Sequence, residues 1–215
     1  PGACPEEGTY TNTWTVTDCA GNVSAVYTQV ITIEDTQAPT WTTAAGALNV
    51  TLQCSDAAGL ATAQSQAPVA TDNCDATLTP VKTAGSFVAG TCPEEGTYTN
   101  TWTVTDCAGN ESAVYTQVIT IEDTQAPTWT TAAGALDVTL QCSDAAGLTT
   151  AQSQAPVATD NCDATLTPVK TAGSFVAGAC PEEGTYTNTW TVTDCAGNVS
   201  AVYTQVITIE DTQAP

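Results

Sequence analysis

Polar and apolar residues alternate along residues 97–106, which read T-Y-T-N-T-W-T-V-T-D. A period of two places Tyr98, Trp102 and Val104 on one face and the threonines on the other, as in a strand with one buried face. Residues 106–110 (D-C-A-G-N) are typical of a turn, and residues 112–121 form a second segment rich in β-branched residues. The pattern therefore predicts a long β-hairpin.

Shorter segments of the same stretch of chain predict four more strands and one helix. The strands are expected at residues 39–43, 47–53, 76–83 and 86–89. Residues 56–66 are rich in Ala, Gln and Leu, and Ser55 or Asp56 precedes them as a helix cap. Together these elements predict a mostly antiparallel, all-β sandwich of the immunoglobulin type with one short helix.

The whole pattern repeats with a period of 88 residues. Residues 36–123 and 124–211 differ at only four pairs of positions, which are Asn49 and Asp137, Ala61 and Thr149, Thr91 and Ala179, and Glu111 and Val199. An 88-residue unit is long enough for one sandwich. We therefore predict tandem immunoglobulin-like domains: residues 1–35 are the C-terminal part of a preceding repeat, 36–123 and 124–211 are complete repeats, and 212–215 begin the next one. The array is expected to continue in both directions, with short, stiff linkers between repeats.

The charge of the chain excludes several classes of function. There are 23 acidic residues, two lysines (Lys82 and Lys170) and no histidine, for a net charge of −21. Nucleic acids and anionic membranes bind clustered basic residues, which this chain lacks. No apolar stretch is long enough to insert into a membrane. Without histidine there is no Ser-His-Asp or Cys-His site, so we expect no enzymatic activity.

Ten cysteines without methionine or histidine indicate an oxidising, extracellular location. Four cysteines in each repeat allow three pairings within it. Cys92 and Cys107 flank the predicted strand, whose eight steps span roughly 26 Å, whereas bridged Cα atoms lie about 4.4 to 6.8 Å apart. This disfavours Cys92–Cys107 and with it the complementary pair Cys54–Cys74.

Two pairings remain, and we favour the one that joins cysteines at the same pole of the sandwich. The alternative joins Cys54 to Cys107 and Cys74 to Cys92. The loops that carry Cys74 and Cys107 are both expected at one pole, and those of Cys54 and Cys92 at the other. The predicted disulfides are thus Cys54–Cys92, Cys74–Cys107, Cys142–Cys180 and Cys162–Cys195, and the partners of Cys4 and Cys19 are expected outside this chain.

Acidic and amide side chains near the turns form a candidate calcium site, since calcium prefers hard oxygen ligands. The candidate ligands are Asp72, Asn73, Asp75, Asp106, Asn110, Glu122, Asp123, Asp160, Asp163 and Asp194. Glu122 and Asp123 lie where the next repeat begins, so an ion there would stiffen the connection. The alternative is a solvated acidic surface that keeps the protein soluble, and no strict D-x-D-x-D-G spacing is present.

Three motifs resemble hyalin-type (HYR) repeats: residues 70–74 (A-T-D-N-C), 85–90 (G-S-F-V-A-G) and 102–110 (W-T-V-T-D-C-A-G-N). With the segments T-Q-V-I-T-I and D-T-Q-A-P that follow, the unit is similar to the Cys-rich repeats of giant Bacteroidetes cell-surface adhesins, including SprB-type gliding-motility adhesins. The resemblance covers the full 88 residues. It implies a very long surface protein, exported by a type IX secretion system, that forms filaments contacting a substratum.

These observations predict the structural shaft of a long extracellular repeat protein or filament. The resemblance implies that this protein is a bacterial surface adhesin with a role in gliding motility. Its partners would be the neighbouring repeats of the same chain and other copies in the filament. One alternative is a multivalent ligand-binding or glycan-binding module, in which repetition supplies avidity. Another is a self-assembling extracellular filament subunit.

Overall fold

The structure is a computed structural model that describes residues 4–5 and 7–214. Residues 1–3, 6 and 215, which fall in the predicted segments 1–35 and 212–215, lie outside the described residues. The chain divides into two compact units, residues 1–50, 58–88 and 97–120 and residues 51–57, 89–96 and 121–215. Two loops of the first complete repeat, 51–57 and 89–96, therefore belong to the compact unit that contains the second repeat.

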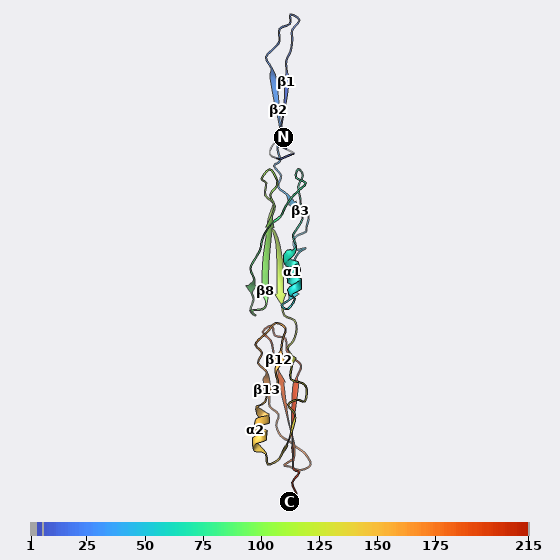
Figure 1. Cartoon of the computed structure of the whole chain (residues 1–215), viewed down its shortest axis with the longest axis vertical. Coiled ribbons are helices and arrows are strands. Elements are labelled where there is room, and N and C mark those ends of the chain that lie inside the picture. Colours follow the sequence, from blue (N-terminus) through green and yellow to red (C-terminus); the bar gives the residue numbers. More distant parts are fainter. Residues whose placement is uncertain (1–3, 6, 215) are drawn as a thin grey trace. The chain divides into compact units, whose positions relative to one another are not determined.

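The second complete repeat contains a five-stranded sheet and a two-stranded sheet (Figure 1). The larger sheet has the order β11-β16-β15-β13, and β14 also pairs with β15. Its strands are β11 (Val138–Gln141), β13 (Val169–Thr171), β14 (Val176–Ala177), β15 (Gly184–Thr191) and β16 (Tyr203–Glu210). Strand β11 runs parallel to β16, and the other pairs are antiparallel. The smaller sheet pairs β10 (Thr128–Trp129) with β12 (Ala158–Thr159).

The first complete repeat has the same strand order, β4-β9-β8-β6 with β7 on β8, and a β3-β5 pair. Its strands are β3 (Thr40–Trp41), β4 (Val50–Gln53), β5 (Ala70–Thr71), β6 (Val81–Thr83), β7 (Val88–Ala89), β8 (Gly96–Thr103) and β9 (Tyr115–Glu122). The long hairpin predicted from alternation is confirmed as β8 and β9. The short strand β5 was not predicted, because the sequence around Ala70 and Thr71 does not alternate and only the pairing with β3 defines the strand.

Residues before the first complete repeat form an antiparallel hairpin of β1 (Gly8–Trp14) and β2 (Tyr27–Ile33). Its sequence matches that of β8 and β9. Trp14 is 49% exposed, whereas the equivalent Trp102 is 2% exposed. The difference arises because, in the described residues, β1 and β2 form a two-stranded sheet without the further strands that pair with β8 and β9.

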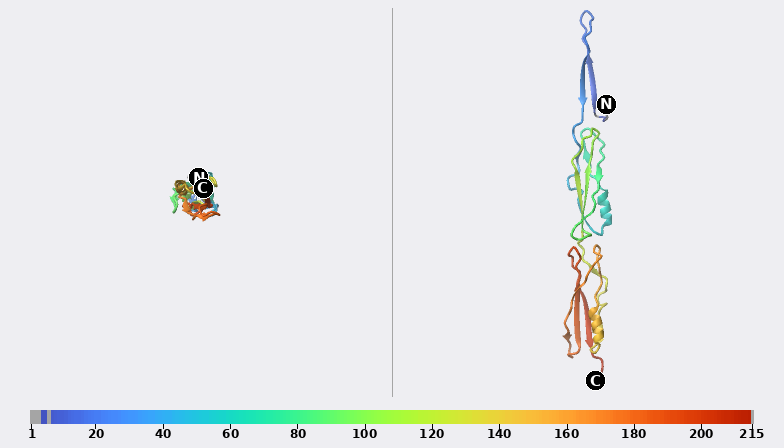
Figure 2. Two further views of the ribbon diagram at one scale, coloured as in Figure 1. Left: turned by 90° about the horizontal axis from the view of Figure 1, so that it is seen from below. Right: turned by 90° about the vertical axis from the view of Figure 1, so that its left-hand side faces the viewer.

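Each complete repeat has one helix packed beside the long hairpin: α1 (Ala57–Ser65) in the first and α2 (Ala145–Ser153) in the second (Figure 2). In the second repeat, Ala151 of the helix packs in a buried cluster with Ile207 and Ile209. The Asp144 side chain caps α2 by accepting a hydrogen bond from the Gly147 amide at 2.8 Å. Neither described helix is long and apolar enough to cross a membrane.

The buried face of the hairpin also contains a pair of amides, which interrupts the apolar pattern. Asn188 and Gln205 are fully buried, and Asn188 Nδ2 donates to Gln205 Oε1 at 2.9 Å. Gln205 Nε2 donates to the backbone oxygens of Leu136 and Ala151. Because buried polar groups need partners, these bonds tie the helix and the segment before β11 to the sheet.

The same network includes the lysine of each repeat. Lys170 Nζ donates to the backbone and side-chain oxygens of Gln152 and lies 5.2 Å from the ring centre of Trp190. Burial lowers the pKa of Lys170 below its usual value. The fold is therefore the predicted one: tandem, all-β, immunoglobulin-like sandwiches with one short helix in each complete repeat.

Candidate functional site at the repeat junctions

We use the term junction for the place where loops of one repeat contact loops of the next. The junction between residues 36–123 and 124–211 lies inside the second compact unit, because that unit includes loops 51–57 and 89–96 of the first repeat. Asn161 Nδ2 donates to Ser55 Oγ across it at 3.2 Å. The junction is therefore a packed part of one unit.

Three disulfides cross the junctions. Cys54 is bonded to Cys162, and Cys92 to Cys195, with Cα atoms 5.9 and 5.7 Å apart. Cys4 is bonded to Cys107 with Cα atoms 5.6 Å apart. The bonded residues are separated by 103 or 108 positions in the sequence. Each disulfide thus joins one repeat to the next.

The predicted pairing is accordingly wrong. The structure contradicts Cys54–Cys92, Cys74–Cys107, Cys142–Cys180 and Cys162–Cys195, and also the expected external partner of Cys4. Among the described residues, Cys19, Cys142 and Cys180 are exposed free thiols.

The predicted pairs all lie within one repeat, whereas the bonded cysteines lie in successive repeats. The loops of Cys162 and Cys195 do share a pole, since the Cys195 amide donates to Asp163 Oδ2 at 3.1 Å. This pole faces the loops of Cys54 and Cys92 in the preceding repeat. The shortest links therefore run across the junction rather than within either repeat.

Each long hairpin ends in a tip that is held by an Asp–Asn pair; the three tips are residues 17–23, 105–111 and 193–199. In the last tip, Asp194 accepts hydrogen bonds from the amide and the side chain of Asn198 at 2.7 and 2.9 Å. Asn198 Nδ2 also donates to the Asp123 backbone oxygen of the preceding repeat at 3.2 Å. The tip thereby contacts the residue at the end of the preceding repeat.

In the middle tip, Asp106 is 7% exposed and makes the same bonds with Asn110. Burial acts to raise the pKa of Asp106, but the hydrogen bonds from Asn110, Gly109 and Ala108 together outweigh it, so the pKa is lowered. The Gly109 φ of +96° lies in the left-handed region that favours glycine. The tip conformation is therefore fixed by the D-C-A-G-N sequence itself.

Three carboxylates converge at the second junction. Oxygen atoms of Asp123, Asp160 and Asp194 all lie within 4.8 Å of one another. Asp123 and Asp194 are buried, at 8% and 6% exposure. Desolvation raises the pKa of Asp123, and the nearby charges of Asp160, Asp194 and Glu95 raise it further, against a lowering by the Gln125 amide.

Within the part of the chain that the structure describes, one carboxylate oxygen of this group accepts no hydrogen bond. Asp160 Oδ1 accepts from the amides of Cys162 and Asp163 at 2.8 and 3.0 Å. Asp160 Oδ2 is buried and without a hydrogen bond. A buried, unpaired carboxylate oxygen beside two other carboxylates is electrostatically unfavourable unless a proton or a cation compensates it.

The equivalent junction in the first unit has a related group. Ligand atoms of Asp35, Asp72 and Cys74 lie within 4.8 Å of one another, and Asp72 Oδ2 is again buried and without a hydrogen bond. Asp35 is missing from the predicted ligands, although the 88-residue period relates it to Asp123. Applying the period to every candidate would have identified it.

The remaining candidate ligands have other partners or lie apart from these groups. Asp75 and Asp163 accept hydrogen bonds from the amides of Cys107 and Cys195, respectively. Asn110 uses its side-chain nitrogen as a donor to the Asp35 backbone oxygen at 3.2 Å. The Asn73 side chain is exposed and donates to Cys74 Sγ at 2.9 Å. Glu122 is exposed and belongs to none of the groups of Asp, Glu and Cys side chains found among the described residues.

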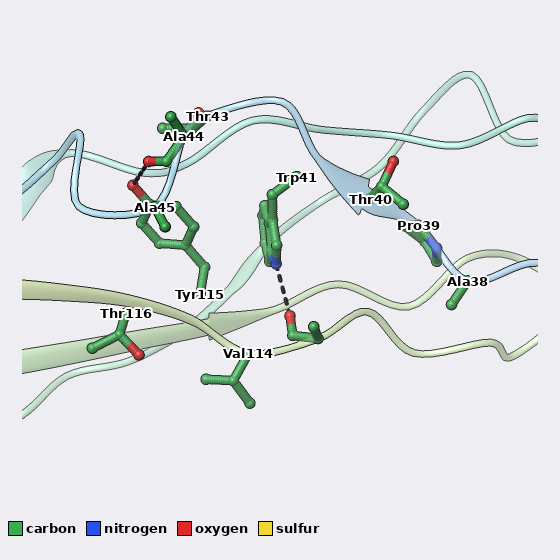
Figure 3. Close-up of a pocket in the computed structure, with 11 residues that line it drawn as sticks. Ala38, Pro39, Thr40, Trp41, Thr43, Ala44, Ala45, Val114, Tyr115 and Thr116 are labelled. Carbon is green, nitrogen blue, oxygen red and sulfur yellow. Dashed lines mark hydrogen bonds between the residues drawn. The ribbon is translucent and has the colours of Figure 1, made fainter.

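A separate groove of about 670 Å³ lies beside Trp41 and Tyr115 (Figure 3). Trp41 Nε1 donates to the Ala113 backbone oxygen at 2.7 Å, and the Tyr115 hydroxyl donates to the Ala44 backbone oxygen at 2.9 Å. The residues that line it are uncharged. These two hydrogen bonds hold the segment before β4 on the hairpin.

Comparison with known proteins identifies the domain type. Residues 42–121 and 130–209 each match the family described as "HYR-like domain with 4 cysteines", and residues 1–35 match a "Bacterial Ig-like domain". The crystal structure of Drosophila N-cadherin EC1-3 is similar with a TM-score of 0.28 and 11% sequence identity, over 96% of this chain and 90% of that chain. No curated protein sequence matches.

The resemblance to HYR repeats is confirmed at the level of the domain family. Disulfide-rich, immunoglobulin-like repeats indicate an extracellular module with a structural or adhesive role. The extracellular location follows from the disulfides, because stable disulfides persist in oxidising compartments. The two matched segments cover more than half of the chain and contain four cysteines each. The chain therefore belongs to the family of HYR-like domains with four cysteines.

Proposed function

We propose that this chain is part of the structural shaft of an extracellular surface protein, and that its disulfides limit how far the shaft extends under load. The observation that carries the proposal is that successive disulfides overlap along the chain. Cys4–Cys107 encloses Cys54 and Cys92, and Cys92 in turn is bonded to Cys195. No position between Cys4 and Cys195 lies outside a disulfide-closed loop.

The overlap leaves a short covalent path for a pulling force. The path from Cys4 to Cys195 crosses the first disulfide to Cys107, returns along the 15 residues to Cys92, and crosses the second disulfide. Fifteen extended residues span roughly 50 Å. The 191 residues of unbonded chain between Cys4 and Cys195 would span roughly 650 Å.

Disulfides inside each repeat would limit the extension of the chain under a pulling force much less. A Cys54–Cys92 bond removes only the 38 residues between those cysteines from the 88 of each repeat. Fifty residues per repeat would then extend when the sandwich unfolds. A bond across the junction leaves 15, so this topology suits a shaft whose length must not change when a domain unfolds.

Single-molecule pulling between handles attached near the two ends tests the proposal. With disulfides intact, unfolding is expected to lengthen the segment from Cys4 to Cys195 by no more than the 15-residue path allows. After reduction, each of the two complete repeats should release a much longer segment. An oxidised chain that extends as far as the reduced chain contradicts the proposal.

The acidic groups at the junctions favour a second role, binding of calcium. The supporting observation is the buried, unpaired Asp160 Oδ2 beside Asp123 and Asp194. Three carboxylates supply the hard oxygen ligands that calcium prefers. Melting the oxidised chain with calcium and with a chelator tests this role: calcium should raise the melting temperature, and identical curves would exclude it.

The location of the shaft is part of the proposal. The family and the disulfides support an extracellular protein, and the resemblance to Bacteroidetes adhesins supports attachment at a cell surface and a role in gliding. The negative charge of −21 favours separation of neighbouring shafts. Fractionation of the source cells and labelling of intact cells with an antibody to this chain test the surface location.

A further inference from the structure

The side-chain amide of Asn161 contacts both sulfur atoms of the Cys54–Cys162 disulfide. Asn161 Nδ2 donates to Cys162 Sγ at 2.9 Å and to Cys54 Sγ at 3.5 Å. The same nitrogen donates to Ser55 Oγ at 3.2 Å. Cys54 and Ser55 belong to the first complete repeat, whereas Asn161 and Cys162 belong to the second. One side chain therefore holds both halves of this disulfide across the junction.

The backbone of each of these cysteines is held within its own repeat. The Cys162 amide donates to Asp160 Oδ1 at 2.8 Å, and the Cys54 amide donates to the Glu122 backbone oxygen at 3.0 Å. These two bonds place the backbones, but they do not select among the staggered rotamers that a cysteine side chain can adopt. The hydrogen bonds from Asn161 act on the sulfur atoms themselves and so favour the rotamers that point toward each other.

The same contact between an amide and a sulfur occurs at the equivalent position of the first complete repeat. Asn73 Nδ2 donates to Cys74 Sγ at 2.9 Å, and the Cys74 amide donates to Asp72 Oδ1 at 2.9 Å. The 88-residue period relates Asn73 to Asn161, and both lie in the sequence D-N-C. This segment therefore orients its cysteine by local contacts, because the aspartate holds the backbone and the asparagine holds the sulfur.

The second disulfide of the same junction is held in a different way. The Cys195 amide donates to Asp163 Oδ2 at 3.1 Å, and the Cys92 side chain is buried. The three acceptors of Asn161 belong to other residues. Cys92–Cys195 therefore serves as an internal reference for any effect that is specific to Asn161.

We propose that Asn161 is the positioning residue for closure of the Cys54–Cys162 disulfide, and that it makes Cys54 the favoured partner of Cys162 in the reduced chain. The inference rests on the proposed function, since it explains why a bond across the junction forms in preference to one within a repeat. The residue acts by holding Cys162 Sγ beside Cys54 Sγ, and it takes no part in the exchange of electrons.

Closure proceeds by two thiol–disulfide exchanges with a small-molecule disulfide such as oxidised glutathione. The Cys54 thiolate first attacks oxidised glutathione and releases one glutathione thiolate. The Cys162 thiolate then attacks Cys54 Sγ in the mixed disulfide, the new S–S bond forms, and the second glutathione leaves with the electron pair of the broken S–S bond. The protons of the two protein thiols pass through water to the two glutathione thiolates. Two protein thiols are thus oxidised as one small-molecule disulfide is reduced.

The test follows closure of both junction disulfides in the same molecule. The full 215-residue chain is reduced with dithiothreitol, transferred to a glutathione redox buffer and sampled over time by alkylation of the remaining thiols. Mass spectrometry of the peptides gives the rates at which Cys54–Cys162 and Cys92–Cys195 form. Asn161→Ala should slow Cys54–Cys162 by roughly three- to tenfold, the effect of one lost hydrogen bond, and should leave the rate for Cys92–Cys195 unchanged.

Two further variants separate positioning from a general effect on the structure. Asn161→Asp keeps nearly the shape of asparagine but has no N–H donor, so it should close Cys54–Cys162 no faster than Asn161→Ala does. Asn73→Ala is the matched control, because Asn73 contacts Cys74 rather than Cys54 or Cys162, and it should leave both rates unchanged. In both Asn161 variants, the fraction of Cys162 bonded to cysteines other than Cys54 should rise.

The two rates also separate failure of this inference from failure of the proposed function. Equal rates of Cys54–Cys162 closure in the unsubstituted chain and in Asn161→Ala overturn the inference. Equal slowing of both disulfides overturns it as well, because a residue that only stabilises the fold would affect both alike, and so does Asn161→Asp closing at the unsubstituted rate. The proposed function survives these results, since both disulfides still form. An unsubstituted chain that reoxidises without Cys92–Cys195 contradicts the proposed function instead.

Discussion

Cys92 and Cys195 are bonded with Cα atoms 5.7 Å apart, although 103 residues separate them. Cys92 precedes β8 in the first complete repeat, and Cys195 lies in the hairpin tip of the second. Both are within one compact unit. The bond therefore makes the junction part of a folded unit and couples the stability of the second repeat to a loop of the first.

Removing this disulfide is expected to destabilise the second unit. Cys195→Ser opens a loop of about 100 residues, which costs roughly 4 to 5 kcal/mol of unfolding free energy in the chain-entropy description. Denaturant unfolding measures the loss. Cys180→Ser is the matched control, because Cys180 is an exposed free thiol, and it should leave the unfolding midpoint unchanged. Equal stability of the two variants would argue against the bond.

The effect of calcium is expected to depend on Asp123. In a chelator, Asp123→Asn should raise the melting temperature, because the substitution removes a buried charge from a group of three carboxylates. With calcium, the same variant should lose the stabilisation that the unsubstituted chain shows. Glu122→Gln is the control, since Glu122 is exposed and lies outside the group, and its response to calcium should be normal.

Stability should fall in acid partly through Asp106. Its pKa is lowered in the folded chain from an ordinary value of 3.8. The stability contributed by its carboxylate is fully present above pH 3.8 and is lost as the pH falls through the lower folded pKa. Melting curves of Asp106→Asn should therefore differ from those of the unsubstituted chain most at neutral pH, and the difference should shrink below pH 3.8.

Asp137→Asn is the matched control for that measurement. The equivalent position in the first repeat is Asn49. Asn49 accepts a hydrogen bond from the Val118 amide of β9, and Asp137 accepts one from the Val206 amide of β16, both at 2.8 Å. This variant should parallel the unsubstituted chain over the whole pH range. A difference for Asp106→Asn that is constant with pH would contradict the ionisation argument.

The buried amide network should be sensitive to loss of Gln205. Gln205→Leu leaves Asn188 Nδ2 with one partner fewer and removes the donor to two buried backbone oxygens. Leaving buried polar groups unsatisfied costs about 1 to 3 kcal/mol each. Gln29→Leu is the control, because Gln29 is the equivalent residue in the exposed hairpin of β1 and β2. Chemical denaturation should show a clear loss for the first variant and little change for the second.

Much of the fold follows from local patterns. The alternation in residues 97–106 predicts β8, and the composition of residues 56–66 predicts α1, because strand and helix periods are properties of the local sequence. The strands β5 and β12 are not predictable in this way. The sequence around them does not alternate, and only the pairing of Thr40 with Thr71 and of Thr128 with Thr159 defines them.

The candidate site was only partly predictable, because part of it forms by contact between two repeats. Turn residues indicate that Asp106 and Asp194 lie near Asp75 and Asp163, and the structure brings those loops together. The contribution of Asp123 to the group with Asp160 and Asp194 depends on contact between two repeats. The repeat period places Asp123 where the next repeat begins, but local patterns do not indicate which side chains of that repeat it contacts.

The sequence by itself determined the 88-residue period, the hairpin and helix of each repeat, and the environment shared by equivalent cysteines. Only the tertiary structure decided that Cys54 and Cys92 bond to the next repeat. Every repeat has the same four cysteines. The period therefore does not indicate whether a cysteine bonds to a partner in its own repeat or to the equivalent partner in the next repeat. The packing of loops 51–57 and 89–96 against the next hairpin tip makes that choice, because a disulfide requires Cα atoms within about 7 Å.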